Sequence, residues 1–417
     1  MKAAGFIGCA VLALTTFRAF GADDFLDAVD DALTVSGWHD AVRARLSGTV
    51  DLEYYQSALP APGLIFSSGR DLFNPRLSLS LDAQLGPRVY LFAQGRADRT
   101  FDPSDDGAQL RLEEYAVRFT PWTDGRLNFQ LGKFATVVGN WVERHDSWDN
   151  PFITAPLPYE NLTGIWDIQA AGSAAMLLVW SHVTPSPLSA GGDDDKYRRL
   201  PIIWGPSYAT GAAVSGIIGK LDFAAELKNA SLSSRPETWD VTQTQWQHPT
   251  WSGRIGYRPD ERWNFGFSAS TGTYLRPAAG PTLAPGYTLG DYRETVLGQD
   301  VGFAWHHVQF WAECYEARFA VPLVGQMDTF AYYLEARYKF TPQFFGALRW
   351  NQQRFSTVPD AAGAMVPWGR NIWRIDIGPE YRFTPHTQLK LQYNLQHEDN
   401  SPRDYTHLIA AQFVVRF

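Results

Sequence analysis

One stretch of the sequence concentrates ionisable side chains in a way that is typical of catalytic sites. Residues 136–167 read TVVGNWVERHDSWDNPFITAPLPYENLTGIWD, and their ionisable members include Glu143, Arg144, His145, Asp146, Asp149 and Glu160. An enzyme could use His145 as a general base, oriented by Asp146 or Asp149. Adjacent residues of an extended segment point apart, however, so we expect that His145 and Asp146 do not pair. Because no serine or cysteine stands in a recognisable nucleophile setting, we expect no enzymatic activity.

The chain begins with the features of a secretory signal peptide. Lys2 is followed by an apolar run over residues 3–14, and small residues suited to cleavage stand at Gly21 and Ala22. The run is too short for a membrane span, which needs about 20 residues. We therefore expect a signal peptide at 1–22, a periplasmic arm or short helix at 23–43, and the main structure at 44–417. The mature chain keeps one cysteine, Cys314, so an intrachain disulfide cannot stabilise it.

The charge of the mature chain restricts its partners. Removing Lys2 and Arg18 leaves 34 basic and 44 acidic residues, a formal charge of −10, which argues against nucleic acid as a partner.

Two groups of possible metal ligands do not have the geometry of a metal site. His306 and His307 would point to opposite sides of a strand, and GGDDDK at Gly191 lacks the spaced ligands of a calcium loop. We expect no bound metal and no cofactor.

Strict alternation of apolar and polar residues runs from about Ala44 to the end of the chain. In TQLKLQYNLQHE, at 387–398, leucines and a tyrosine occupy one face, while lysine, asparagine and glutamines occupy the other. The same pattern recurs in PRLSLSLDAQL, at 75–85, and in WRIDIGPEYRF, at 373–383. Such alternation predicts strands with one wet face and one apolar face.

Short and long connections alternate between these predicted strands. Short turns contain glycine or proline, as in FTPQ at Phe340 and FTPH at Phe383. Long polar loops occupy roughly 57–74, 99–109, 135–166, 184–206, 231–249, 275–294, 320–328, 355–370 and 398–404. Nine long loops and eight short turns predict an antiparallel barrel of about 18 strands, within a range of 16 to 18.

Strand length and aromatic placement favour a membrane barrel over a soluble β-sandwich, which also alternates. The alternating segments run to roughly 10 to 13 residues, as tilted membrane strands do, whereas soluble strands have about 5 or 6. Aromatic residues cluster where the strands end, as an interfacial girdle requires: Phe119, Trp122, Tyr257, Trp263, Phe340, Phe344, Tyr381 and Phe383. The fold class is therefore all-β, a closed transmembrane barrel with short periplasmic turns and long extracellular loops.

The last residues, YTHLIAAQFVVRF, place apolar residues at alternate positions before the terminal Phe417. This ending resembles the insertion signal of bacterial outer-membrane porins. The resemblance implies the outer membrane of a diderm bacterium, contact with its lipid, recognition by the barrel insertion machinery and, by analogy, a homotrimer. The expected strand count is more similar to that of sugar-specific and amino-acid or aromatic-acid-specific channels than to 16-stranded general porins. The general porins' P-E-F-G-G constriction motif is absent, so no porin family's site residues are carried over.

Arginines fall on the polar faces of the predicted strands, where they would line the lumen: Arg76, Arg96, Arg337, Arg349, Arg374 and Arg382. One interpretation is a ladder that guides anions through the pore, because arginine forks match carboxylates and phosphates. The favoured interpretation is salt bridging along the wall, since Asp82, Asp98 and Glu335 share these faces.

The position and composition of residues 135–166 predict that this segment forms a pore constriction. Residues 135–166 form the third long loop, and their many apolar side chains need a surface to pack on, such as the inner wall of the barrel. The segment is similar in this respect to porins in general, in which the third long loop forms the constriction. We therefore expect the charged residues named above to form the pore eyelet, and the following to form a stacking surface for sugars: Trp141, Trp148 and Tyr159.

The predicted function is a channel for passive diffusion of small hydrophilic solutes, narrowed by loop 135–166. The alternative is a non-transport barrel that binds surface polysaccharide or assembles envelope components. An open lumen would favour the channel and a plugged lumen the alternative.

Overall fold

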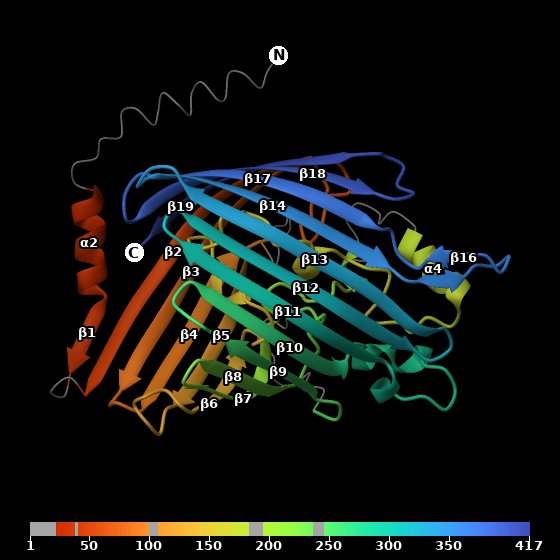
Figure 1. Ribbon diagram of the computed structural model, residues 1–417, viewed down its shortest axis with the longest axis horizontal. Helices are drawn as coiled ribbons and strands as arrows, with labels where there is room; N and C mark the ends of the chain where they lie inside the picture. The colour runs from red at the N-terminus through yellow and green to blue at the C-terminus, as the bar shows by residue number, and fades with distance from the viewer. Residues whose placement is uncertain (1–21, 38–40, 100–106, 183–194, 237–245) are drawn as a thin grey trace, which may run out of the picture.

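The computed structural model describes residues 22–37, 41–99, 107–182, 195–236 and 246–417. Figure 1 shows long, tilted strands that wrap into a barrel, with short connections at one end and long connections at the other. The predicted signal peptide, apart from Ala22, lies outside the described residues, as do residues 191–194 of the GGDDDK run.

Sixteen antiparallel strands of the described chain form a closed barrel, which confirms the predicted fold class. The first and last strands pair to close it, with Ser57 opposite Leu408 and Thr49 opposite Arg416. The barrel strands are β2 (Val42–Ser57), β3 (Asp71–Leu85), β4 (Val89–Asp98), β5 (Gln109–Phe119), β6 (Asn128–Phe134), β7 (Ala209–Ile218), β8 (Leu221–Lys228), β9 (Thr250–Tyr257), β10 (Trp263–Thr273), β11 (Arg293–Trp305), β12 (Val308–Val321), β13 (Gly325–Lys339), β14 (Phe344–Phe355), β17 (Ile372–Arg382), β18 (Thr387–Glu398) and β19 (Thr406–Arg416).

The count lies at the lower end of the predicted range because one expected pair of strands is absent from the described chain. The residue pattern predicts separate loops at 135–166 and 184–206, with strand between them. In the structure a single connection runs from β6 to β7, and the intervening AAMLLVWSH forms helix α4 (Ala174–His182). Its apolar residues follow no period of two, so they cannot present one wet face. The described barrel therefore has the strand number given above for general porins, 16, and not the 18 on which the similarity to solute-specific channels was based.

The two faces of the strands are arranged as the alternation predicts. In β18, Leu391 and Tyr393 face outward and are exposed, whereas Gln388 and Lys390 face inward and are buried. Aromatic side chains gather at the short-turn end, where the ring centroids of Phe340 and Phe344 lie 5.4 Å apart. An apolar outer band with an aromatic border is the surface that lipid requires of a barrel.

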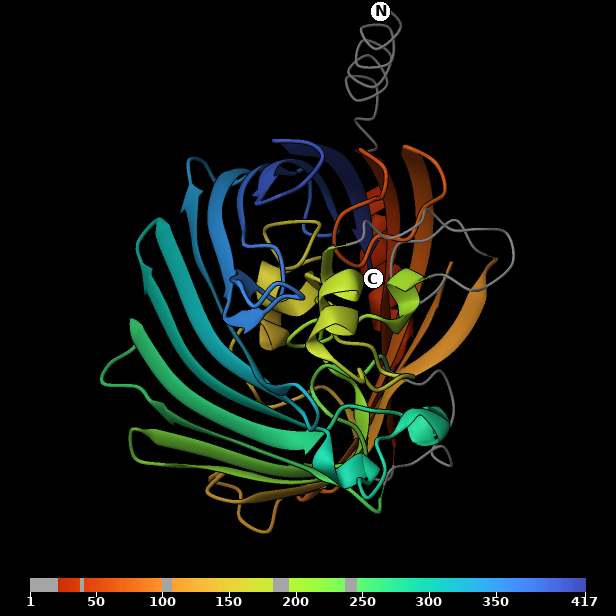
Figure 2. The same cartoon turned by 90° about the vertical axis from the view of Figure 1, so that its right-hand side faces the viewer.

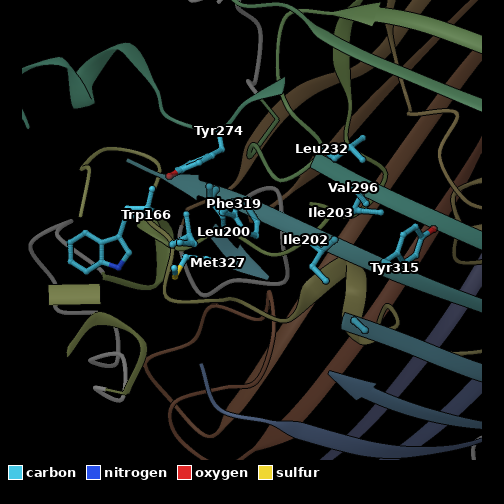
Figure 3. Close-up of a cluster of buried hydrophobic side chains, with 14 of the residues drawn as sticks. Trp166, Leu200, Ile202, Ile203, Leu232, Tyr274, Val296, Tyr315, Phe319 and Met327 are labelled. Atoms are coloured by element: carbon cyan, nitrogen blue, oxygen red, sulfur yellow. The ribbon is translucent and has the colours of Figure 1, made fainter. Parts of the chain in front are cut away.

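The described parts of the β6–β7 connection, 135–182 and 195–208, pack against the inner faces of the strands and extend to the end with the long connections, where α4 lies (Figure 1). Figure 2, viewed from the end with the long connections, shows these yellow to yellow-green parts within the outline of the ring of strands. It contains the 3₁₀ turn η1 (Val142–Arg144) and helices α3 (Leu157–Glu160), α4 and α5 (Asp195–Arg198). Its apolar side chains, including Leu200, Ile202 and Ile203, form one buried cluster with the inner faces of β11 to β13 (Figure 3).

The other connections are smaller. The β10–β11 connection holds the 3₁₀ turns η2 (Pro277–Thr282) and η3 (Leu289–Asp291), and the β14–β17 connection holds the hairpin β15 (Thr357–Pro359) and β16 (Met365–Pro367). None of the helices in the described ranges is long and apolar enough to cross a membrane.

The N-terminal segment attaches to the short-turn end. Helix α2 (Ala22–Ala32) leads into β1 (Thr34–Gly37), which pairs with the start of β2, so Thr34 stands opposite Arg45. Asp30 of the helix accepts two-pronged hydrogen bonds from Arg45, and Asp27 pairs with His386 at 2.8 Å.

Candidate pore constriction

The segment with the predicted eyelet residues is compact rather than extended. Residues 142–144 form the 3₁₀ turn η1, and the backbone continues in a helical conformation at His145. Further on, Pro156 and Pro158 flank the start of α3, where fixed proline φ angles suit the first helical turn. Both turns direct side chains toward the wall of β12 to β18.

One buried carboxylate on β12 holds the start of this segment. Glu313 accepts hydrogen bonds from the backbone amides of Asn140 and Trp141 and, at 2.6 Å, from the hydroxyl of Tyr159. Gly139 precedes these residues with φ +79°, and a Cβ atom there would collide with the hydroxyls of Tyr159 and Tyr315. A glycine at 139 is therefore needed for the loop backbone to approach the wall this closely.

A chain of alternating charges joins the loop to the wall a second time. It begins and ends on the loop and passes through β13, β14 and β17 in the order Arg144, Glu335, Arg349, Asp376, Arg374 and Glu160. The contact between Arg349 and Asp376 measures 2.7 Å, and both side chains are fully buried. Three arginines and three acids leave the chain formally neutral, which a water-excluded site requires of buried charges.

Burial acts on the acid at the end of this chain. It raises the pKa of the Glu160 carboxyl above its ordinary value, and the Arg374 guanidinium opposes part of that rise. Glu160 also accepts a hydrogen bond from the backbone amide of Ala155, so it closes the α3 turn as well as joining the loop to β17.

The structure separates the six eyelet candidates into two groups. Glu143, Asp146 and Asp149 are exposed, whereas Arg144 and Glu160 are buried in the charge chain. The exposed acids can face a solute, and the buried pair positions the loop.

His145 lies between these groups and corrects one expectation. Its Nε2 atom lies 2.7 Å from the Tyr208 hydroxyl and 3.5 Å from a carboxylate oxygen of Asp146. The prediction that the two neighbours point apart is wrong because the backbone turns here instead of extending. The nearby Ser147 hydroxyl donates to Asp51 at 2.9 Å, so it is not directed at His145.

The aromatic candidates are buried, which removes them from contact with a solute. The exposed fractions of Trp141, Trp148 and Tyr159 are 4%, 6% and 0%. The rings of Trp141 and Tyr159 pack with centroids 4.6 Å apart, and the Arg416 guanidinium lies 4.0 Å from the ring centre of Trp148. These side chains fix the loop in place and offer no free ring face for a sugar.

The six wall arginines of the sequence analysis are all engaged with carboxylates. Arg349 and Arg374 are covered by the loop, while the other four are less completely buried. The pairs outside the charge chain are Arg76 with Asp51 and Glu53, Arg96 with Asp98 and Glu113, and Arg337 and Arg382 with Glu380. This arrangement matches the salt-bridging interpretation rather than a ladder of available cations.

The opposite wall, formed by β3 to β9, borders a cavity of about 700 Å³. Glu143 and Asp146 of the loop line one side of it. Three arginines that the sequence analysis did not select line the other side: Arg118, Arg254 and Arg258. Arg254 pairs with Asp222 and Asp300, whereas Arg118 donates to the neutral Gln130. Alternation in EYAVRF and WSGRIGY assigns Arg118 and Arg254 to an inner face, but only the folded loop distinguishes an open wall from a covered one.

Comparisons with known proteins support the fold at low sequence identity. OmpF of Salmonella typhi matches with a TM-score of 0.55 and 11% identity, covering 92% of this chain and 100% of its own. An anion-selective porin from Comamonas acidovorans has a TM-score of 0.54 and 11% identity, covering 90% and 100%. The outer-membrane channel DcaP of Acinetobacter baumannii has a TM-score of 0.54 and 12% identity, covering 92% and 100%. No protein-family model and no curated protein matches the chain. The chain therefore has the fold of outer-membrane porins.

Proposed function

We propose that the protein is a channel in the outer membrane of a diderm bacterium for passive diffusion of small hydrophilic solutes. The observation that carries this proposal is the asymmetry of the lumen, where one wall is covered by the β6–β7 connection and the other borders a cavity of about 700 Å³. A barrel of this strand number encloses an interior too wide for its own wall side chains to fill. The solute path runs along β3 to β9, and residues 135–166 narrow it.

The charges around the cavity favour cations. Its acidic lining residues outnumber the three arginines and are Asp82, Glu114, Glu143, Asp146 and Asp222. A narrow, water-filled passage with this excess of carboxylates attracts cations and repels anions. Glu143 and Asp146 face arginines across the path, so solutes also cross a transverse field.

Single-channel recording of the purified protein in planar bilayers tests both parts of the proposal. We expect discrete conductance steps and, in a salt gradient, a reversal potential of the sign that cation preference gives. Correctly folded protein without ion conductance would refute the channel. Conductance with anion preference would refute the assignment of the charged residues alone.

A second candidate function is a non-transport barrel that binds surface polysaccharide or assembles envelope components. The buried cluster of Figure 3 favours it, because described parts of the β6–β7 connection pack apolar side chains against the inner faces of β11 to β13 and occupy space inside the barrel there. Saturable polysaccharide binding by a protein without conductance would support this candidate over the channel.

Two further partners are part of the proposal. The strand that ends at Arg416, just before Phe417, closes the barrel against β2, and we propose that the insertion machinery recognises this strand. A homotrimer is proposed by analogy with other porins, and sedimentation of the detergent-solubilised protein tests it.

A further inference from the structure

A second cavity, of about 310 Å³, lies at the end of the barrel that carries the long connections. Four connections enclose it, namely those between β2 and β3, β6 and β7, β14 and β17, and β18 and β19. It shares no lining residue with the larger cavity along β3 to β9. A ligand from outside the cell could therefore enter it without passing the constriction.

Basic side chains dominate the charged lining of this outer pocket. Among the described lining residues, Lys196, Arg199, Arg370 and Arg403 are basic, and the single carboxylate is Glu398. Glu398 lies 3.7 Å from Arg370, and Arg403 is exposed and donates to the backbone carbonyl of Leu59 at 3.1 Å. A neutral carbonyl does not cancel the charge of a guanidinium, so an anion in the pocket would be attracted.

The basic groups are also held in place. The Lys196 ammonium is buried and donates to the carbonyls of Ala61 and Ile65, which fastens the β2–β3 connection to the β6–β7 connection. Arg370 donates to the backbone carbonyl of His182, while its Nε atom is buried and has no hydrogen-bond partner in the described chain. A site whose donors are fixed before the ligand arrives loses less entropy on binding.

Apolar side chains complete the wall, including Leu59, Pro60, Leu162, Phe355 and Ile372. A fully hydrated inorganic ion would gain nothing from these surfaces, whereas an apolar group would be removed from water there. The cavity volume lies at the lower end of the range for small-molecule sites, about 300 to 1,000 Å³.

We propose that this outer pocket binds a small organic anion, a carboxylate carried on a compact apolar body. The site goes beyond the proposed channel function, because it lies off the path along β3 to β9 and requires no conduction. Binding would link four connections, including the one that continues from the constriction through Asn161 to Gly164.

Calorimetric titration of the purified full-length protein with benzoate tests the proposal. Benzamide serves as a neutral ligand of the same shape, and acetate as an anion without the apolar body. We expect saturable binding of one benzoate per chain, and affinities at least tenfold lower for benzamide and acetate. No saturable benzoate binding, or equal affinity for benzamide, would refute the proposal that the pocket binds an organic anion. Equal affinity for acetate would refute the proposal that the ligand carries an apolar body.

Variants then locate the bound benzoate. The double substitution R370Q/R403Q should weaken benzoate binding at least tenfold, whereas Arg318→Gln should not change it. Arg318 is an exposed arginine at the outer end of β12 that pairs with Asp328 outside the pocket. Arg118→Gln should also leave the benzoate affinity unchanged, which would show that benzoate does not bind in the larger cavity. Weaker binding in Arg118→Gln, or unchanged binding in R370Q/R403Q, would overturn the assignment.

Conductance separates this inference from the channel proposal. Each variant is first checked for folding by the heat-dependent shift of its electrophoretic mobility and for conductance in bilayers. Wild-type protein that conducts without binding benzoate refutes only the outer pocket. Protein that binds benzoate without conducting refutes only the channel.

Discussion

The two halves of the lumen wall have similar polar sequences but different surroundings. On β12 to β18 the inward-facing Glu313, Glu335, Asn351 and Lys390 are at most 2% exposed, because the β6–β7 connection covers them. On β3 to β9 the inward-facing side chains that line the large cavity, such as Arg118 and Asp222, remain partly exposed. The difference teaches that inward polarity alone does not mark a pore lining. A polar wall residue meets either solute or loop, and only the path of the loop decides which.

Deleting residues 143–160 should have the largest effect on this difference. The deletion removes both loop ends of the charge chain and the exposed acids, so both walls would border water. We expect single-channel conductance to rise several-fold in planar bilayers. Unchanged conductance in a folded variant would mean that the loop does not narrow the path.

Substituting the β12 carboxylate Glu313 should weaken the attachment of the loop to the wall without removing the loop. Glu313→Ala leaves the amides of Asn140 and Trp141 without their acceptor, at a cost of about 3 kcal/mol, or roughly a hundredfold in hydrogen-exchange protection. The measurement is amide exchange by mass spectrometry, together with open-channel current noise.

Glu316→Ala is the matched control for this substitution. Glu316 lies on the same strand but faces outward and is exposed. Equal protection of the loop amides in the Glu313 and Glu316 variants would contradict the role assigned to Glu313.

Neutralising the exposed acids should change the ion preference of the large cavity. It should leave the attachment of the loop to β12–β18 intact. The double variant E143Q/D146N removes two carboxylates from the large cavity, and cation preference should fall by roughly twofold or more. Reversal potentials in a salt gradient measure this change. Asp124→Asn, in the exposed β5–β6 turn, is the control, and an equal shift in both variants would show that the charges act from a distance and not at the constriction.

The pH dependence of the loop attachment is the smallest expected effect. Burial raises the folded-state pKa of Glu160 above its ordinary value of 4.5, so the folded chain holds this proton more tightly than the unfolded chain. Its contribution to stability is therefore full below pH 4.5 and is lost as the pH rises through the raised pKa.

Amide exchange in α3, corrected for intrinsic rates, should show protection falling with rising pH in the wild type, and this dependence should flatten in Glu160→Gln. Asp149→Asn replaces an exposed acid of the same loop and should keep the wild-type profile. Protection that increases with pH would mean that the ionised pair of Glu160 with Arg374 outweighs the cost of burial.

Much of the fold could be predicted because its cause is local. The period-two pattern in 387–398, the aromatic residues at strand ends and the porin-like ending at Phe417 predicted a membrane barrel with alternating turns and loops. The strand count was harder, because 135–208 contains polar stretches that look like two loops. Helix α4 depends on tertiary packing, because its Leu177 and Trp180 lie in the buried cluster with the β11 to β13 wall.

The sequence by itself determined which face of each strand is apolar, since a side chain's direction in a strand follows from its position. It also determined that residues 135–166 need a surface to pack on. Only the tertiary structure decided which acids are exposed and which are buried, because Glu143 and Glu160 carry the same carboxyl group. Their difference comes from Arg374, a residue more than two hundred positions away, whose charge stabilises a carboxylate where water is excluded.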